Sequence, residues 1–481
     1  MSKIKSFFKD TIVYGLAAVL PKAVNVFLVS LHTLTLSTSQ FSVNTIFYVW
    51  IAYLNILLTY GMETAFFRFY NTEKSKDKVI STSFISLLST TVLALAILLY
   101  FSSPIADFMG FSKPIFFQMM ITIAILDTLV VIPFAYLRVK GKSLQYAGFK
   151  ILSIVIYAIF NILFLWYLPQ HPESSIRTII SFEPSFKEGY IFVANLIASG
   201  FIFIALLPIM FKAKWNFDFQ LWKKMLVYAW PVLVAGLAYT TNENLDKLVL
   251  EDLVGADSMG AYAGAYKIGV MMSLYILAFR LGAEPFFFNQ AKEKNAKTNY
   301  ALITKWFTIV GSLFLLTIVV LIYPIASIFL KSSAYYAALD IVPIILAANL
   351  FLGVYNNLSI WYKLTNKTKY GMYISVFGAL LTAILLFQTI PAVGYIGAAW
   401  ATFIAYGAMM LISYFLGRKH YKVPYDLLGI GLYLTIAIAF SFLSFYQFRE
   451  NYWVGISLIL CLCIIIYLRE AKELKSLLQR F

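Results

Sequence analysis

The sequence is organised around Gly61-Met62-Glu63-Thr64-Ala65-Phe66-Phe67-Arg68-Phe69-Tyr70, which closes a long apolar run and carries two opposite charges where apolar sequence gives way to polar. A shorter copy closes another apolar run much later: Gly282-Ala283-Glu284-Pro285-Phe286-Phe287-Phe288. A lysine-bearing loop follows each copy. Two such segments with similar flanks predict a duplicated bundle of helices.

The composition places most of the chain in a membrane. Of its 481 residues, 61% are hydrophobic and 12% are charged, whereas about a quarter of the residues of a soluble domain are charged. Apolar runs of about 20 residues, long enough to cross a bilayer as helices, recur throughout. Fourteen spans are predicted, at 11–33, 43–65, 79–101, 115–137, 148–168, 189–211, 225–248, 259–286, 302–324, 337–361, 371–390, 394–416, 426–446 and 452–468.

The basic residues predict the orientation of these spans. Of the 38 lysines and arginines, 29 fall in loops or at span ends on the side of the N-terminus, 6 on the opposite side and 3 deeper inside spans. Because cytoplasmic loops are enriched in Lys and Arg, both termini are predicted to be cytoplasmic. The net charge of +16 is dispersed over eight such segments, so it indicates membrane topology rather than a nucleic-acid-binding patch.

The repeat predicts two halves with the same orientation. Val13-Tyr14 matches Val227-Tyr228, and Gly61-Met62-Glu63 matches Gly282-Ala283-Glu284, in each case six spans apart. An even number of spans gives a parallel repeat, with a substrate site expected between the halves near the membrane midplane. The expected parts are an N-terminal lobe at 1–215, a C-terminal lobe at 216–420, and two remaining spans with a cytoplasmic tail at 421–481.

No catalytic or metal-binding motif is found. Gly141-Lys142-Ser143 matches the end of a phosphate-binding loop, but position 136, where that motif needs glycine, is Tyr136. Cys461 and Cys463 stand in the last apolar run, with no histidine or second cysteine pair at metal-site spacing. The sequence therefore predicts neither an enzyme nor a metal site, and no cofactor.

Ionisable and polar side chains inside the spans are the candidate site residues, because a buried charge in a membrane usually faces a cavity or a partner. Lys22 and Lys267 lie at mid-span in opposite halves, and two cations in one cavity suit an anionic substrate such as a diphosphate. Arg280 and, at the inner rim, Arg68 are further candidate substrate-binding cations. The cavity-lining or ion-coupling candidates are Asn25, Asp127, Asn242, Asp246 and Asn349.

Structural roles are the alternative for several charged residues. Arg280 and Glu284 stand one turn apart and can form an intrahelical ion pair. Glu63 can pair with Arg68 at the cytoplasmic interface, so both glutamates are interpreted as ion-pair residues or repeat markers. The small residues of Gly260–Gly264 favour close helix packing.

Other positions keep more than one interpretation. Asp127 can pair with a basic cavity group, cap another helix, or couple transport to Na⁺ or H⁺. Asp246 can simply mark the outer end of its span. Lys22 and Lys267 can snorkel towards the membrane surface instead of lining a cavity. Asn25 and His32 lie near the helical face of Lys22, so this face can line a water-filled vestibule.

The chain resembles the polysaccharide-unit flippases (O-antigen/capsule type, Wzx-like) of the multidrug/oligosaccharidyl-lipid/polysaccharide (MOP) superfamily over essentially its whole length. The features that carry the resemblance are Gly61–Phe69, Trp230-Pro231 with Asn244–Leu250, and Gly260–Lys267. The resemblance implies an all-α integral membrane protein with two parallel six-helix lobes in a V and two extra C-terminal helices. It also implies translocation of an undecaprenyl-diphosphate-linked oligosaccharide from the cytoplasmic to the periplasmic leaflet, by alternating access, for polysaccharides such as the O-antigen of lipopolysaccharide.

The related lipid II flippases imply a site and partners. They use basic residues in spans 1, 2 and 8, where Lys22, Arg68 and Lys267 stand in comparable places here. Their two extra C-terminal spans form a lipid groove. The implied protein is a monomer of the bacterial inner membrane. Its partners would be a lipid-linked oligosaccharide, membrane lipid, a glycan polymerase and glycosyltransferases, with no nucleic acid. Two alternatives remain open: a multidrug cation antiporter, which usually has twelve spans, and a non-transporting scaffold of a glycan-assembly complex.

Overall fold

The computed structural model describes residues 2–111, 113–210, 215–291, 293–365 and 367–478. Within these ranges every regular element is a helix. Fourteen helical segments in this described part of the chain are long and apolar enough to cross a membrane. Each of the fourteen overlaps one predicted span, so the all-α membrane fold and the number of spans are confirmed.

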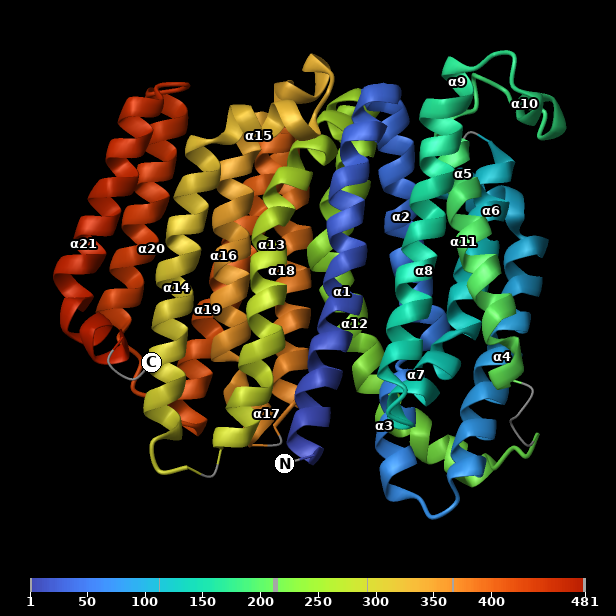
Figure 1. Cartoon of the computed structure of the whole chain (residues 1–481), viewed down its shortest axis with the longest axis horizontal. Helices are drawn as coiled ribbons and strands as arrows, with labels where there is room; N and C mark the ends of the chain where they lie inside the picture. The colour runs from blue at the N-terminus through green and yellow to red at the C-terminus, as the bar shows by residue number, and fades with distance from the viewer. Residues whose placement is uncertain (1, 112, 211–214, 292, 366, 479–481) are drawn as a thin grey trace. The chain divides into compact units, whose positions relative to one another are not determined.

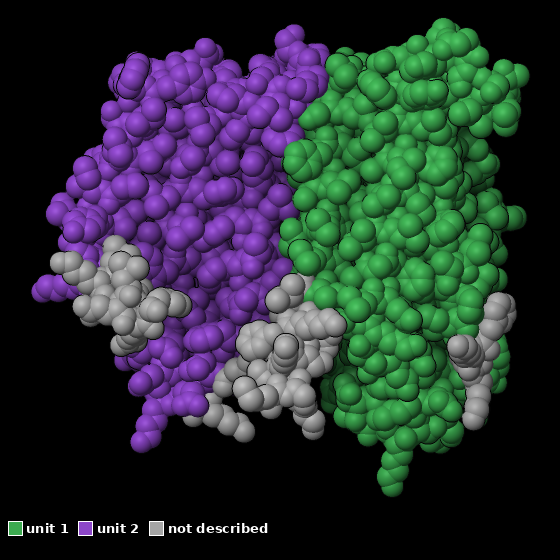
Figure 2. Space-filling view, viewed as in Figure 1, with its two compact units in different colours: residues 1–263 green, residues 264–481 purple. Residues whose placement is uncertain are grey.

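The chain divides into two compact units, residues 1–263 and 264–481 (Figure 2). The helices of unit 1 are α1 (Ser2–Thr35), α2 (Thr38–Thr59), α3 (Met62–Thr72), α4 (Lys76–Tyr100), α5 (Ser102–Phe108), α6 (Pro114–Leu129), α7 (Val131–Val139), α8 (Ser143–Ile162), η1 (Leu163–Tyr167), α9 (Leu168–Gln170), α10 (Ser175–Ile179), α11 (Lys187–Met210) and α12 (Phe219–Val254). The boundary between the units falls inside α13 (Ala256–Gln290).

Unit 2 continues from α13 with α14 (Ala296–Val320), α15 (Ile322–Phe329), η2 (Ser333–Ile341), α16 (Val342–Leu358), α17 (Ile360–Leu364), α18 (Lys369–Val393), α19 (Tyr395–His420), α20 (Leu427–Phe442), η3 (Leu443–Gln447) and α21 (Tyr452–Leu478) (Figure 1). Two spans are interrupted in the same way, six spans apart. Val130 separates α6 from α7 in the fourth span, and Ser359 separates α16 from α17 in the tenth.

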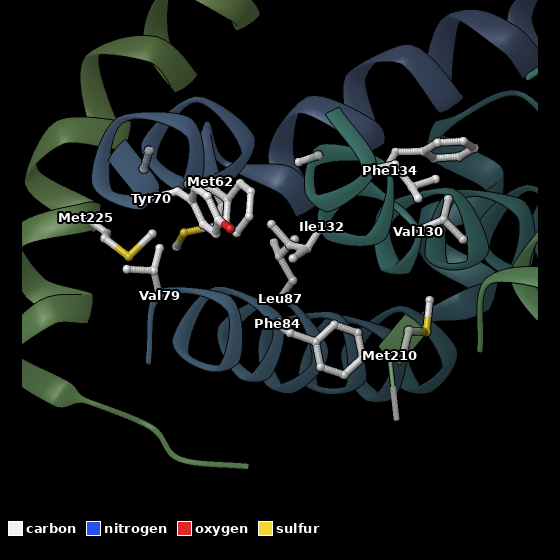
Figure 3. Packing of buried hydrophobic residues seen from close by; sticks show 14 of the residues in the cluster. Met62, Tyr70, Val79, Phe84, Leu87, Val130, Ile132, Phe134, Met210 and Met225 are labelled. Carbon is white, nitrogen blue, oxygen red and sulfur yellow. The ribbon is translucent and has the colours of Figure 1, made fainter. Parts of the chain in front are cut away.

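The Gly61–Tyr70 stretch forms a sharp break and a core helix. Tyr60 and Gly61 have φ of 34° and 75°, which ends α2 and starts α3 in a new direction. Met62, Ala65 and Phe66 of α3 are fully buried. They belong to a core cluster that includes Val79, Ile132 and Met225 among its members (Figure 3). The stretch therefore holds α3, α4, α7 and α12 together at one end of unit 1.

Helix α12 packs along α2 over much of its length. The Ser42 hydroxyl donates to Glu251 at 3.1 Å, and the Tyr53 hydroxyl donates to Thr241 at 3.3 Å. This packing places α12 in unit 1, so the unit ends later than the predicted N-terminal lobe at 1–215. The lobe boundaries at 215 and 420 stay predictions.

The start of α13 also packs closely on α2. A Cβ built on Gly260 would lie 1.8 Å from the carbonyl oxygen of Thr38. The Thr38 hydroxyl donates to Asp257 at 2.6 Å. The close packing predicted for Gly260 is therefore confirmed.

Candidate functional site

Glu284 of α13 joins two cations in unit 2. Arg280 Nε lies 3.9 Å from Glu284 Oε2, one helical turn away, which confirms the predicted pair. Glu284 Oε1 also accepts a short hydrogen bond from Lys363 Nζ of α17. Lys363 was not among the predicted site residues, because its partner stands 79 positions away in the sequence.

A small cavity, lined by both apolar and polar side chains, adjoins this ion-pair cluster. Its volume is about 20 Å³, and its lining includes Arg280, Glu284, Lys363, Asn356 and Asn357. Two cations surround one carboxylate, so the cluster carries a net positive charge. The amides of the two asparagines add neutral donors. Such a set can bind an anion, and the cavity as it stands holds a group no larger than about one water molecule.

Unit 1 contains the corresponding pair. Arg138 Nη1 of α7 lies 3.5 Å from Glu63 Oε1 of α3. Glu63 and Glu284 occupy matching positions of the sequence repeat, and each pairs with a cation from the short helix that ends the span two further along. The sequence repeat is therefore matched by an equivalent glutamate–cation pair in each unit.

The predicted Glu63–Arg68 pair is wrong. Five residues of an α-helix turn through about 500°, which places the two side chains on different faces. The Arg68 guanidinium instead lies 4.3 Å from the centre of the Tyr228 ring of α12. Arg138 forms the ion pair with Glu63. Arg68 is exposed and keeps its position as a candidate contact for an anion.

The two mid-span lysines belong to different units. Lys22 and Asn25 are exposed on α1 in unit 1, and Lys267 is half-buried on α13 in unit 2. A shared cavity for the two lysines stays a prediction. The vestibule expected at His32 is wrong, because His32 is buried and its Nε2 lies 2.9 Å from Asn161 Oδ1.

Asp127 lies beside a buried polar network in unit 1. It accepts a hydrogen bond from the Ser199 hydroxyl at 2.8 Å. One turn along α11, Asn195 donates to the Tyr48 hydroxyl at 3.4 Å, and that hydroxyl lies 3.2 Å from the hydroxyl of Tyr157. These neutral partners come from α2, α8 and α11, and sequence reasoning that searched for charges missed them.

Asp246 and Lys247 form a buried ion pair in α12. They are 3% and 5% exposed, and Lys247 Nζ lies 2.9 Å from Asp246 Oδ1. The Tyr262 hydroxyl of α13 donates to Asp246 Oδ2 at 2.6 Å. The carboxylate is thus held by a cation and a phenol, which ties α12 to α13.

The two candidate asparagines bond to backbone carbonyls. Asn242 Nδ2 donates to the Ala238 carbonyl of its own helix at 3.0 Å. Asn349 Nδ2 donates to the Gly269 carbonyl at 3.3 Å and links α16 to α13. Both side chains are buried, and these bonds give each of them a structural role.

Comparison with known proteins identifies the family. A family model described as "Polysaccharide biosynthesis protein" matches residues 7–289, which is more than half of the chain. A second model, MatE, matches residues 231–387. No curated protein sequence matches the chain significantly.

Solved structures confirm the fold. The chain is similar to "Lipid II flippase MurJ, inward closed conformation", with a TM-score of 0.72 and 16% identity over 95% of this chain and 99% of that chain. An inward-facing multidrug resistance MATE family transporter of the MOP superfamily gives a TM-score of 0.64 and 13% identity, covering 86% of this chain and 96% of that one. An outward-facing transporter of this kind gives a TM-score of 0.59 and 13% identity, covering 86% of this chain and 95% of that chain. The chain belongs to the polysaccharide biosynthesis protein family, and its described residues form fourteen helices that are long and apolar enough to cross a membrane.

Proposed function

We propose that the protein moves an undecaprenyl-diphosphate-linked oligosaccharide from the cytoplasmic to the periplasmic leaflet of a bacterial inner membrane, for synthesis of a surface polysaccharide such as O-antigen. The observation that carries the proposal is the net-positive cluster of Arg280, Lys363 and Glu284, in a chain of the polysaccharide biosynthesis family. The protein acts as a transporter and not as an enzyme. Both termini are cytoplasmic.

The diphosphate displaces a carboxylate in this mechanism. Glu284 is the internal counterion of Arg280 and Lys363 while the site is empty. An arriving diphosphate carries more negative charge, so it takes over both cations, with the guanidinium binding two oxygens and the ammonium acting as a point charge. The site widens beyond its 20 Å³ as the headgroup enters. Lys22, Lys267 and Arg68 supply further positive charge along the path.

The substrate crosses the membrane by alternating access, and the membrane potential drives the transport. One charge that crosses 100 mV gains about 2.3 kcal/mol. Asp127, with Ser199 and the tyrosines beside it, is the group on which Na⁺ or H⁺ coupling would act. The protein works as a monomer beside a glycan polymerase and glycosyltransferases.

The match of the MatE model to residues 231–387 favours a second candidate, a multidrug cation antiporter. A site for a cationic drug is expected to contain more acidic than basic side chains, whereas the Glu284 cluster has two cations for one carboxylate. A non-transporting scaffold would tolerate loss of these charges without loss of export.

Export of surface glycan in cells tests the site. Arg280→Ala with Lys363→Ala is expected to lower export at least about tenfold. Loss of even one charge-assisted contact with the substrate costs about 1.5 kcal/mol or more, which corresponds to about a factor of ten. Glu284→Gln, which keeps both cations, is expected to export near the wild-type level. Lys294→Ala with Lys297→Ala removes two cations from the adjoining α13–α14 segment and serves as the matched control.

Protein levels are compared for every variant. Normal export by the Arg280→Ala, Lys363→Ala variant, at normal protein level, would contradict the proposed site. Lys22→Ala with Lys267→Ala is measured in parallel, and a drop in export is expected there too. Loss of cationic-dye efflux with glycan export intact would instead support the antiporter.

A further inference from the structure

Two cavities share a wall beneath the α9–α10 segment of unit 1. One has a volume of about 350 Å³, and the other has a volume of about 560 Å³. Phe164 of η1 lines both. Each volume falls in the range of small-molecule sites, about 300–1,000 Å³. The segment lies at the end of unit 1 opposite the α3–α4 turn (Figure 1).

The two cavities differ in chemistry. Arg177 and Lys187 line the smaller one, together with Trp166 and Phe182. The larger one is mainly apolar, and three of its lining residues carry polar groups: Ser181 and Glu183, which are exposed, and Tyr190, which is buried. Its apolar lining includes Phe160, Leu163, Ile180, Val193 and Ile197. A ligand that fills both must have an anionic end and an apolar end.

Neither cation of the smaller cavity has a carboxylate partner in the described ranges of the chain. Arg177 Nη1 donates to the Leu168 carbonyl at 3.4 Å, and Lys187 Nζ donates to the Thr35 carbonyl at 3.3 Å. Both side chains keep further donors, since a guanidinium has five and an ammonium three. The neighbouring Glu188 does not neutralise them, because its carboxylate accepts from Lys113 and Gln40.

Exposed apolar side chains around the cavities place them at headgroup depth. Trp166 is 45% exposed and Ile179 is 79% exposed, at the end of the fifth span and on the short α10. Tryptophan gathers at membrane–water interfaces, where its ring lies at the depth of the lipid headgroups. The cationic cavity therefore meets the membrane where lipid phosphates are found.

We propose that the two cavities bind one phosphate-headed anionic lipid, with its phosphate between Arg177 and Lys187 and its chain in the apolar cavity beyond Phe164. Arg and Lys are the side chains that bind phosphate oxygens with charge-assisted hydrogen bonds. The bound lipid holds the α9–α10 segment against α1 and α11, because Lys187 and Thr35 contribute to the same cavity. The site does not depend on which substrate the protein transports.

Native mass spectrometry of the full chain, released from nanodiscs, tests the proposal. The nanodiscs contain equimolar phosphatidylglycerol and phosphatidylcholine, and wild type is expected to retain phosphatidylglycerol preferentially. Arg177→Ala with Lys187→Ala is expected to lower its retention at least about tenfold. Lys331→Ala with Arg449→Ala, which removes two cations that line neither cavity, is expected to leave retention unchanged.

Filling the apolar cavity gives an independent test. Val193→Trp keeps both cations and is expected to reduce retention as well. Melting temperatures in lipid-free detergent check that each variant is folded. Equal retention of the two lipids by wild type, or equal phosphatidylglycerol retention by wild type and the Arg177→Ala, Lys187→Ala variant, would overturn the proposal. Addition of undecaprenyl phosphate distinguishes two kinds of natural ligand. If it displaces the bound phosphatidylglycerol, the site is assigned to the undecaprenyl carrier lipid. If phosphatidylglycerol stays bound, the site is assigned to the bulk phospholipid of the membrane.

Discussion

Lys247→Met is expected to lower the free energy of unfolding by about 3–5 kcal/mol, because it leaves a buried carboxylate without its cation. Asp246 is 3% exposed, and Lys247 Nζ lies 2.9 Å away. The Tyr262 hydroxyl can still donate to Asp246, but a neutral phenol does not balance a full charge. Reversible unfolding in mixed micelles, followed by circular dichroism, gives the free-energy difference.

The double variant Asp246→Leu, Lys247→Met is the control. It removes both charges, and replacement of a whole buried pair by apolar residues is often neutral or stabilising. We expect it to recover most of the stability lost by Lys247→Met. If Lys247→Met alone unfolds like wild type, the pair is not buried in the way described.

Gly61→Ala is expected to destabilise the protein by about 2–4 kcal/mol, through backbone strain and steric overlap. Gly61 has φ of 75°, which L-residues with a Cβ rarely adopt, and its added Cβ would lie 2.7 Å from the Ala229 carbonyl oxygen. The overlap is with backbone, so a rotamer change cannot relieve it. The affected contact joins α3 to α12.

Gly282→Ala is the matched control from the other copy of the repeat. Gly282 lies inside α13, and a Cβ there would meet no atom within 4 Å. Because alanine favours a helix over glycine by about 0.8–1 kcal/mol, this change is expected to be neutral or slightly stabilising. Equal losses at Gly61 and Gly282, measured by the same unfolding assay, would contradict the account of the break at Gly61.

The sequence predicted the membrane fold well because burial in lipid leaves long apolar runs. Every span was located, yet the break at Tyr60–Gly61 was not, because a glycine in an apolar run fits a straight helix as well. The two repeat copies show this limit directly: the helix breaks at Gly61 and continues through Gly282. The backbone direction is set by the α3–α12 packing, which the local sequence does not contain.

The candidate site was predictable only where partners are close in sequence. Arg280 and Glu284, one turn apart, pair as predicted. Glu63 forms an ion pair with Arg138, which stands 75 positions away in the sequence, and not with the nearby Arg68. Sequence spacing shows which side chains share a helical face, but the choice between partners on different helices depends on tertiary packing.

Translocation in reconstituted vesicles tests the proposed flippase activity most directly. Purified protein is placed in proteoliposomes with a labelled undecaprenyl-diphosphate-linked oligosaccharide in one leaflet, and appearance of the glycan in the other leaflet is followed under a membrane potential. We expect transfer with wild type, and at least about tenfold slower transfer with Arg280→Ala, Lys363→Ala at equal protein content. Transfer no faster than in protein-free vesicles, while the same wild-type vesicles move a cationic dye, would contradict the proposed function.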